Sequence, residues 1–367
     1  MGAQSLWEQI EPLLDHVERP SRYLNHEYNA FDGVGGARDA VATGDTTTHA
    51  TPVPAPTGVG AAASAVAPLA PQGDAPVVAP YRAALLYPDT YELGQSNQAI
   101  AILYHLINGL DGCAAERVYL PWVDMIALMR QKAIPLFTLE STDPVASFDL
   151  LGITLPHELA ATNILEALDL AGIPLKAVDR TQAHPLVVGG GPCAFNPEPV
   201  AAFFDVIVIG EGEDVTPELI AAHRACMARH ATRDELLATL ATIDGVYVPS
   251  LYELDTHGVL VPRVPNAPHT VRKRVIADFD ACPVVTNPVV PFAEVVHDRL
   301  TVEVLRGCTR GCRFCQAGML YRPVRERTVD TIIDAVARGL ANTGYEEVSL
   351  TSLSTTDHSQ IEQILRR

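Results

Sequence analysis

Hydrophobic residues follow two alternating patterns along most of the chain, one typical of buried strands and the other of amphipathic helices. Short, nearly continuous apolar runs indicate strands, whereas an apolar residue every three or four positions indicates a helix. The strand-like runs are 81–88, 116–122, 147–155, 184–192 and 203–213, and the helical stretches are 96–109, 157–174 and 214–230. Strands that alternate with helices at this spacing favour a parallel, doubly wound sheet. We therefore expect an α/β domain over residues 80–230.

The segments before this domain have weaker patterns. Residues 1–32 begin with a short amphipathic helix, whose apolar positions are Leu6, Ile10, Leu13, Leu14 and Val17. Residues 33–79 consist mostly of Ala, Gly, Pro and Thr and contain no aromatic residue. Such a segment buries too little apolar surface to offset the entropy lost on ordering, so we expect a disordered linker.

A second strand–helix–strand pattern occupies residues 301–367. It follows a connecting region at 231–300 that is expected to contain a helix, a hairpin and a Pro-rich stretch. Its first strand leads directly into a loop with Cys308, Cys312 and Cys315. Active sites of parallel α/β folds lie at the carboxyl ends of strands, so this loop is a candidate site. Three thiolates can bind three irons of a [4Fe–4S] cluster and leave the fourth iron open to an outside ligand.

Other interpretations of the three cysteines are weaker. A structural zinc site needs a fourth ligand, and the next histidine, His358, lies far along the chain. A ferredoxin-type cluster would also need a fourth thiol, which Cys282 could supply. Inert core cysteines are disfavoured because the neighbouring residues are Arg, Gly and Thr. The metal prediction therefore stands on Cys308, Cys312 and Cys315.

The residues around the cysteines are suited to a cluster. Gly307 and Gly311 would let the loop wrap closely round it. Three arginines, Arg306, Arg310 and Arg313, could offset the negative charge of the thiolates and of a carboxylate ligand.

The CxxxCxxC spacing at 308–315, with Phe314 just before the last cysteine, resembles the signature of radical S-adenosylmethionine (SAM) enzymes. The resemblance implies that the open iron binds SAM, that reduction of the cluster cleaves SAM to a 5′-deoxyadenosyl radical, and that Phe314 packs near the adenine. Ser352, Ser354 and Thr355, at the end of the next strand, are the matching SAM contacts, although the family's Gly-Gly-Glu sequence is absent there. The alternative is that Thr355 or Thr356 caps the following helix.

A dinucleotide is a poor candidate ligand for the first domain. The sequence at 210–214 resembles half of a dinucleotide fingerprint, but Val215 replaces its third glycine. Glu211 and Glu213 would also repel a pyrophosphate at the start of the following helix.

The first domain instead resembles a flavodoxin-like cobalamin-binding domain, through the sequences 88–94, 152–159, 187–192 and 208–213. Tyr91 replaces the histidine that ligates cobalt in that family, and a phenol with a pKa of about 10 is a poor axial ligand at neutral pH. The resemblance therefore implies cobalamin without a histidine ligand. Its implied contacts are Asp89, Tyr91, Gly94, Thr154, Gly189, Gly190, Gly191, Gly210 and Gly212. The alternative is that these glycines only close turns between strands and helices.

Taken together, residues 1–32 and 80–367 resemble a branch of the cobalamin-binding-domain radical SAM proteins. The expected fold is a flavodoxin-like parallel sheet followed by the first βα units of a TIM-like radical SAM barrel. The expected activity is reductive cleavage of SAM, with cobalamin-dependent methyl transfer as a further step and a flavodoxin or ferredoxin as electron donor. The alternatives are a radical SAM protein whose α/β domain binds no cobalamin, and an iron–sulfur electron carrier or scaffold.

The length of the second domain limits the barrel. Six βα units need on the order of 190 residues, and residues 301–367 suffice for two units and a helix. We expect either a fragment or a chain whose barrel is completed in trans, and we expect that the chain alone does not turn over SAM productively.

Composition adds the cellular setting. The chain has 44 acidic and 26 basic side chains and a net charge of −18, which disfavours binding to nucleic acid. No apolar run is long enough for a membrane span, and no signal peptide is evident. The seven cysteines are mostly scattered, which is typical of a reducing cytoplasm.

Overall fold

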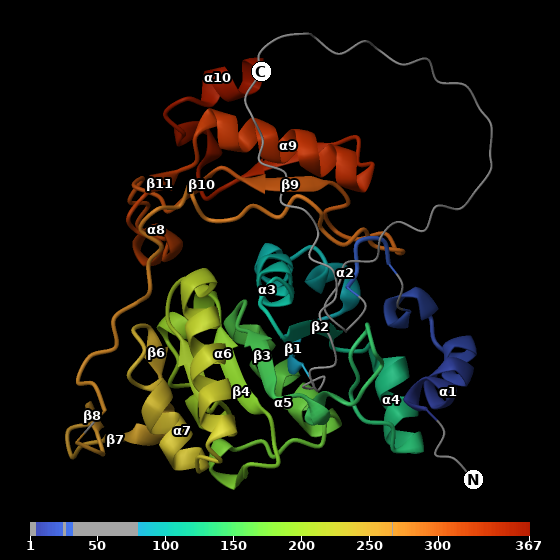
Figure 1. The fold of residues 1–367 in the computed structure, drawn as a ribbon, viewed down its shortest axis with the longest axis vertical. Helices are drawn as coiled ribbons and strands as arrows, with labels where there is room; N and C mark the ends of the chain where they lie inside the picture. Colours follow the sequence, from blue (N-terminus) through green and yellow to red (C-terminus); the bar gives the residue numbers. More distant parts are fainter. Residues whose placement is uncertain (1–4, 25–26, 32–79, 266) are drawn as a thin grey trace, which may run out of the picture.

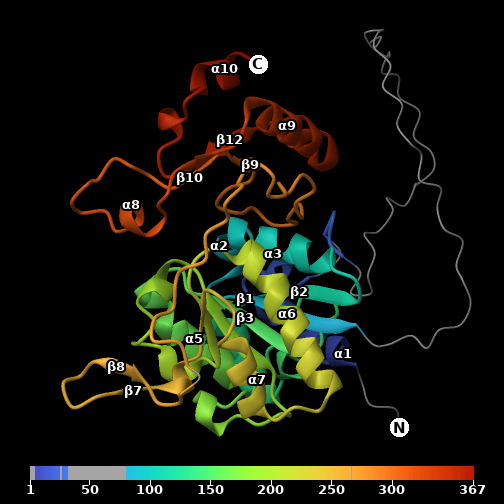
Figure 2. The same cartoon turned by 60° about the vertical axis from the view of Figure 1, so that its left-hand side comes forward.

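The computed structural model describes residues 5–24, 27–31, 80–265 and 267–367. The linker predicted at 33–79 lies outside the described residues. Figures 1 and 2 show a larger α/β body that contains the sheet β1–β6, and a smaller body around β9 and α9 that lies against one edge of the larger one. Among the described residues, no helix is both long and apolar enough to cross a membrane.

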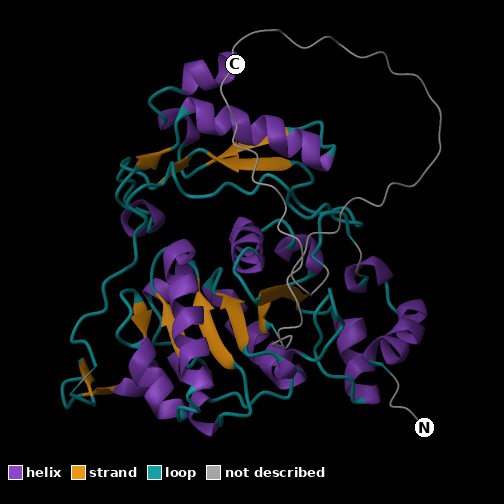
Figure 3. Cartoon of the chain, viewed as in Figure 1, coloured by secondary structure: helices purple, strands orange, loops and turns teal. Residues whose placement is uncertain are grey.

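The larger body is built on a six-stranded sheet of order β2-β1-β3-β4-β5-β6 (Figure 3). The first five strands are parallel and β6 is antiparallel to β5, so the prediction of a mainly parallel α/β sheet is confirmed. Its last strand extends the sheet past residue 230, into the region expected to be a connector. The strands are β1 Tyr81–Tyr87, β2 Cys113–Tyr119, β3 Leu150–Thr154, β4 Leu186–Gly190, β5 Val206–Val208 and β6 Val246–Tyr247.

Helices cover both faces of this sheet because successive side chains of each strand point to opposite sides. On β1, Ala83 and Leu85 pack in one core with α3, α6 and α7, whereas Ala84 and Leu86 pack in another with α4 and α5. These helices are α3 Gln98–Asn108, α4 Val123–Lys132, α5 Ala161–Leu170, α6 Gly212–Ala228 and α7 Arg233–Leu240. Burial on both faces explains why the strands read as continuous apolar runs.

The N-terminal segment packs against the same body, but its helix is shorter than expected. A capping box of Ser5 and Glu8 starts α1 at Leu6–Ile10, and the chain then tightens into the 3-10 helix η1, Glu11–His16. Pro12 lies at the start of η1, and proline lacks the N–H that an α-helix interior requires. Ile10 and Leu13 are nevertheless buried in the core, as the amphipathic pattern predicts.

The smaller body contains one parallel strand pair and its helix. Strands β9 (Leu300–Glu303) and β12 (Val348–Thr351) pair in parallel, with Leu300 opposite Val348. Helix α9, Val329–Thr343, approaches β9 closely because Gly339 has no side chain: a Cβ there would lie 2.6 Å from the Leu300 side chain. Helix α10, Ile361–Arg366, follows β12.

Short elements complete the chain. The hairpin predicted near residues 255–258 is formed by β7, Tyr252–Leu254, and β8, Leu260–Pro262, and projects from the larger body in Figure 2. Around the cysteines lie β10 Leu305–Arg306, α8 Ala317–Leu320 and β11 Arg325–Glu326, and α2 Tyr91–Gly94 follows β1. The remaining 3-10 helices are η2 Pro20–Tyr23, η3 Val145–Ser147, η4 Glu158–Ala160, η5 Ala177–Asp179, η6 Pro192–Phe195, η7 Ala201–Phe203, η8 Pro249–Leu251 and η9 Thr355–Asp357.

The two bodies meet at the carboxyl ends of the first sheet. Gln98, which begins α3, donates from Nε2 to the Thr301 carbonyl of β9 at 3.4 Å. On the other side of the contact, the ring of Phe195, just after β4, lies edge to face with Tyr321 at 6.2 Å. The cysteine loop therefore lies over the edge of the first sheet where ligands of parallel α/β folds usually bind.

Candidate functional site

The three cysteines lie in a loop between β10 and α8, with a glycine before the first and another before the second. Gly307 has φ +91°, and a Cβ there would lie 2.6 Å and 2.7 Å from the carbonyl oxygens of Pro323 and Tyr321. Gly311 has φ +66°. Both conformations are costly for other residues, so the two glycines set the path of the loop.

The thiols are free and reachable. Cys308 and Cys315 are half-buried and Cys312 is exposed, and none forms a disulfide. In the described part of the chain, no three His, Cys, Asp or Glu side chains converge on one point as ligands of a single metal ion do. A zinc ion needs all of its ligands within about 2.0–2.3 Å of one centre. Three thiolates leave a structural zinc ion one ligand short of four, whereas each of them can bind its own iron of a [4Fe–4S] cluster.

The arginines around the loop do not all serve the thiols. Arg306 is held in ion pairs with Glu303 at 2.7 Å and Glu213 at 2.8 Å, so its charge is already balanced. Arg310 donates from Nε to Asp357 at 2.6 Å, and this hydrogen bond, with a smaller contribution from the nearby Cys308 and Cys312, raises its pKa. Both arginines are thus paired with carboxylates; Arg310 is the more exposed of the two, and its charge also interacts with Cys308 and Cys312.

The three residues predicted to contact SAM lie together beside the cysteine loop. Ser352 and Thr355 share a hydrogen bond of 3.0 Å between their hydroxyls, and Ser354 donates from its hydroxyl to Asp357 at 2.7 Å. Asp357 in turn binds Arg310 of the cysteine loop. The alternative role as caps of α10 is wrong, because that helix begins after Gln360.

Phe314 points into solvent. Its side chain is 93% exposed, whereas most aromatic side chains of this protein are buried or half-buried. Such a ring is free to stack on a planar ligand.

Tyr91 is sealed inside the protein. Its hydroxyl donates to the carboxylate of Glu27, and its ring lies edge to face with Tyr119 at 5.3 Å. Burial raises the pKa of Tyr91 far above the ordinary range of a phenol. The sequence did not indicate this partner, since Glu27 belongs to the N-terminal segment, far along the chain from Tyr91. Tyr91 therefore cannot face a ligand at the edge of the sheet.

Most of the candidate cobalamin glycines make room for the protein itself. A Cβ at Gly94 would lie 2.3 Å from the Tyr119 ring, and one at Gly189 would lie 3.0 Å from the Phe204 ring. Gly191 and Gly210 have φ +117° and +112°, and the main chain of Arg274 lies directly against Gly210. Gly190 is more open, with its nearest neighbour at 3.9 Å.

The polar candidates are also engaged locally. Asp89 accepts from the N–H of Thr90 at 2.7 Å, Thr154 pairs with Gly190 in the ladder between β3 and β4, and Gly212 would place a Cβ 3.3 Å from Leu103. These residues do not form an open cradle for cobalamin, and the turn-closing interpretation explains most of them.

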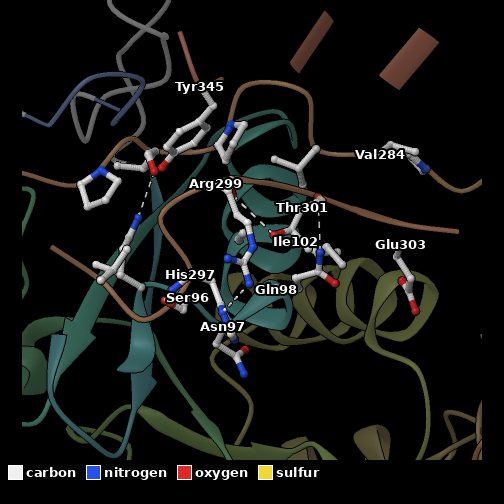
Figure 4. Close-up of a pocket in the computed structure, with 18 of the residues that line it drawn as sticks. Ser96, Asn97, Gln98, Ile102, Val284, His297, Arg299, Thr301, Glu303 and Tyr345 are labelled. Carbon is white, nitrogen blue, oxygen red and sulfur yellow. Dashed lines mark hydrogen bonds between the residues drawn. The ribbon is translucent and has the colours of Figure 1, made fainter. Parts of the chain in front are cut away.

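A cleft lies between the start of α3 and the inner side of β9 (Figure 4). Its unfilled space is about 760 Å³, solvent-facing part included. Ser96, Asn97 and Gln98 line it from the first body, and Arg299 and Thr301 from the second. Arg299 donates to His297 at 3.3 Å, while its Nε is buried with no partner among the described residues. No local motif marks these residues in the sequence, because the cleft forms only when the two bodies meet.

Two family models match the chain. One, described as radical SAM proteins, N-terminal, matches residues 99–249, and the other, the radical SAM superfamily, matches residues 302–367. The second match contains the whole cysteine loop. The chain therefore carries radical SAM family domains.

Three relatives illustrate the range of similarity. The uncharacterized protein MJ0966 of Methanocaldococcus jannaschii is 25% identical over 286 residues, which are 77% of this chain and 51% of that protein. The ribosomal protein uS12 methylthiotransferase RimO of Prochlorococcus marinus (strain MIT 9215) is 30% identical over 142 residues, 37% of this chain and 28% of RimO. The radical S-adenosylmethionine methyltransferase TsrM of Kitasatospora setae matches with a TM-score of 0.45 and 16% identity, over 78% of this chain and 50% of TsrM. The chain thus spans about half the length of MJ0966 and less of RimO.

Proposed function

We propose that this protein binds a [4Fe–4S] cluster through Cys308, Cys312 and Cys315 and reductively cleaves SAM. The observation that carries the proposal is a set of three free thiols in a glycine-shaped loop, inside the part of the chain that matches the radical SAM superfamily. A cluster held by three cysteines supplies one open coordination position and the electron that reductive cleavage needs.

The neighbouring residues suit the other parts of SAM. The hydroxyls of Ser352, Ser354 and Thr355 lie at the carboxyl end of β12 and can form hydrogen bonds with the polar groups of SAM. Arg310 lies beside the thiols, and its guanidinium, which also binds Asp357, can donate hydrogen bonds to a carboxylate there. The exposed ring of Phe314 can stack on the adenine.

The test is anaerobic reconstitution with iron and sulfide, followed by metal analysis and EPR with and without SAM. We expect about four irons and four sulfides per chain and an EPR signal of the reduced cluster that changes when SAM is added. Cys308→Ala, Cys312→Ala and Cys315→Ala should each lose the cluster. Cys193→Ala, which removes a half-buried thiol outside the loop, is the matched control and should keep it.

Two results would point elsewhere. Zinc in place of iron and sulfide would contradict the proposal outright. A reducible cluster whose EPR signal ignores SAM would favour the electron carrier or scaffold.

The wider architecture is part of the proposal. The order β2-β1-β3-β4-β5 is that of flavodoxin-like sheets. The parallel strands β9 and β12, joined through α9, have the arrangement of one βα unit of a barrel and its next strand. We infer that a flavodoxin or ferredoxin in the cytoplasm supplies the electron.

Cobalamin-dependent methyl transfer is the second candidate, favoured by the flavodoxin-like strand order. Tyr91 and most of the glycines at the sheet edge are engaged within the protein, so no step proposed here uses cobalamin. Titration with hydroxocobalamin tests it directly: a changed visible spectrum in the protein-bound fraction supports the second candidate. A spectrum identical to that of free hydroxocobalamin, with none retained on desalting, excludes it.

A further inference from the structure

The carboxyl end of β5 and the base of the cysteine loop meet in a group of five charged side chains. Arg306 and Arg325 stand opposite each other in the short ladder between β10 and β11, and both reach the carboxylate of Glu211. Glu213 and Glu303 complete the group by pairing with Arg306. We call these five residues the Glu211 cluster. Each of their side chains is less than a quarter exposed, so water screens these charges only in part.

Glu211 makes the most directional contacts of the group. Arg325 donates to its two carboxylate oxygens at 2.6 Å and 2.7 Å, and the N–H of Ile276 donates to one of them as well. Two parallel bonds from one guanidinium fix the orientation of both partners. Burial by itself would raise the pKa of Glu211, but these hydrogen bonds and the charge of Arg306 hold that pKa below its usual value.

The main chain of Glu211 is fixed to the first sheet. Glu211 directly precedes α6, and its N–H donates to the carbonyl of Arg274 at 3.1 Å. The N–H of Arg274 donates to the carbonyl of Ile209 at 2.8 Å, so the chain at 274 continues the edge of the sheet beyond β5. The glycine at 210 permits this contact, since any side chain there would collide with the Arg274 backbone.

Both ends of the cysteine loop are tied to this fixed point. At the start of the loop, Arg306 comes two residues before Cys308 and pairs with Glu213 at the beginning of α6. After the loop, Lys273 donates from Nζ to the carbonyls of Leu320 and Arg322 at the end of α8, and Arg325 of β11 binds Glu211. The larger body therefore contacts the chain both before and after the three thiols.

Given the proposed cluster function, we propose that Glu211 is a positioning residue for the iron–sulfur site: it holds the two ends of the cysteine loop together and adds a negative charge beside it. The Glu211 cluster by itself carries one net negative charge, from three carboxylates and two guanidinium groups, and Lys273 lies close enough to balance it. The Gly-Glu-Gly-Glu sequence at 210–213 thus anchors the cysteine loop, a role distinct from contact with a nucleotide or cobalamin.

Two consequences follow from removing this carboxylate. The loop loses one of its links to the first sheet, so a bound cluster should be lost more easily. The surroundings of the cluster also become one charge more positive, which favours the reduced, more negative state, so the midpoint potential should become less negative.

The test compares wild type, Glu211→Gln, Glu211→Asp and Asp214→Asn after reconstitution with iron and sulfide. Asp214 is an exposed carboxylate in the same first turn of α6, so its variant controls for the loss of one charge there. We expect Glu211→Gln to release iron to a chelator about tenfold faster than wild type and to show a less negative midpoint potential. Glu211→Asp keeps the charge but shortens the reach, so it should release iron faster with little change in potential. Asp214→Asn should match wild type in both measurements.

The outcomes separate this inference from the proposed function. A wild-type chain that takes up no iron and sulfide overturns the proposed function and this inference with it. If wild type takes up iron and sulfide, but Glu211→Gln matches it in the rate of iron release and in midpoint potential, the inference alone is overturned. If Glu211→Gln does not fold, judged by circular dichroism, Glu213→Gln replaces it. That variant removes one partner of Arg306, and the same two shifts are expected; their absence overturns the inference.

Discussion

Both bodies of this protein contain helix-covered strands and arginine–carboxylate ion pairs, but the examples in the larger body are much more deeply buried. In the larger body, β1 is covered on both faces by helices, and the guanidinium of Arg117 is only 2% exposed between Glu27 and Glu140. In the smaller body, every residue of β12 is half-buried, and Arg310 is 62% exposed in its pair with Asp357. The larger body is thus the more deeply packed scaffold, and the smaller one presents the candidate cysteine loop on its surface, where functional loops usually lie.

The largest expected effect comes from breaking the scaffold's buried ion network. Arg117→Met should destabilise the larger body by about 3–5 kcal/mol, because the buried carboxylates of Glu27 and Glu140 would lose the positive charge that they share. Urea unfolding followed by circular dichroism measures this loss. Arg130 is the matched control, since it also pairs with two carboxylates but is 48% exposed, and Arg130→Met should leave the midpoint unchanged. Equal midpoints for both variants would show that burial does not distinguish the two networks.

A buried histidine makes the scaffold sensitive to acid. His223 pairs with the hydroxyl of Tyr81 at 2.8 Å, and burial, with the charge of nearby Arg233, lowers its pKa from 6.5 to about 4 against the opposing effect of Asp205. The unfolded chain therefore takes up this proton at a higher pH than the folded one. Stability should fall as the pH drops from 6.5 to 4, by up to about 3 kcal/mol.

Unfolding by urea between pH 7 and pH 4 checks this sign. His223→Gln keeps a hydrogen-bonding group for Tyr81 but cannot titrate, so its stability should depend less on pH over that interval. If the free energy of unfolding depends on pH equally steeply in His223→Gln and in wild type, other groups cause the acid sensitivity.

Substitution of two glycines, Gly94 and Gly190, distinguishes a glycine needed for packing from one that could make room for a ligand. Gly94→Ala should destabilise the scaffold by about 1–3 kcal/mol, because the added Cβ would meet the Tyr119 ring at 2.3 Å. That ring cannot move aside easily, since its hydroxyl donates to Gln95 and it packs on Tyr91. Gly190→Ala should be tolerated, because its nearest neighbour lies at 3.9 Å.

The same pair of variants tests the cobalamin prediction. Suppose that wild type retains hydroxocobalamin, and that Gly94→Ala has the same melting temperature as wild type but retains none. The glycine would then make room for a ligand, and the packing explanation would be wrong. The melting temperature and the bound visible spectrum together distinguish these cases.

Local patterns in the sequence were sufficient for most elements of the scaffold and for choosing the candidate site. The apolar runs predicted β1, β3 and β4 because strands buried on both faces need continuous apolar side chains, and the hairpin of β7 and β8 follows from its turn. The cysteine loop was evident from spacing alone.

Contacts between distant segments could not be read in the same way. Glu27 meets Tyr91 and Arg117, and Glu211 meets Arg325, across more than 60 residues in each case, and no period or spacing records such pairs. The sequence showed Gly94 and Tyr91 as ligand candidates because a glycine that makes room for a ring looks the same as one that makes room for a cofactor. Only the packing of Tyr119 decides between them.

The smallest expected effect concerns the exposed pair that joins the cysteine loop to the end of β12. Asp357→Asn removes the charge that binds Arg310 but keeps an oxygen that can accept from the Ser354 hydroxyl. Because the pair is exposed, the urea midpoint should not change. Iron release to a chelator should rise, but by less than in Glu211→Gln, since Arg310 holds only the exposed middle of the loop whereas Glu211 holds its ends. An iron-release rate above that of Glu211→Gln would reverse this ranking and make the surface pair, rather than the scaffold, the main support of the three thiols.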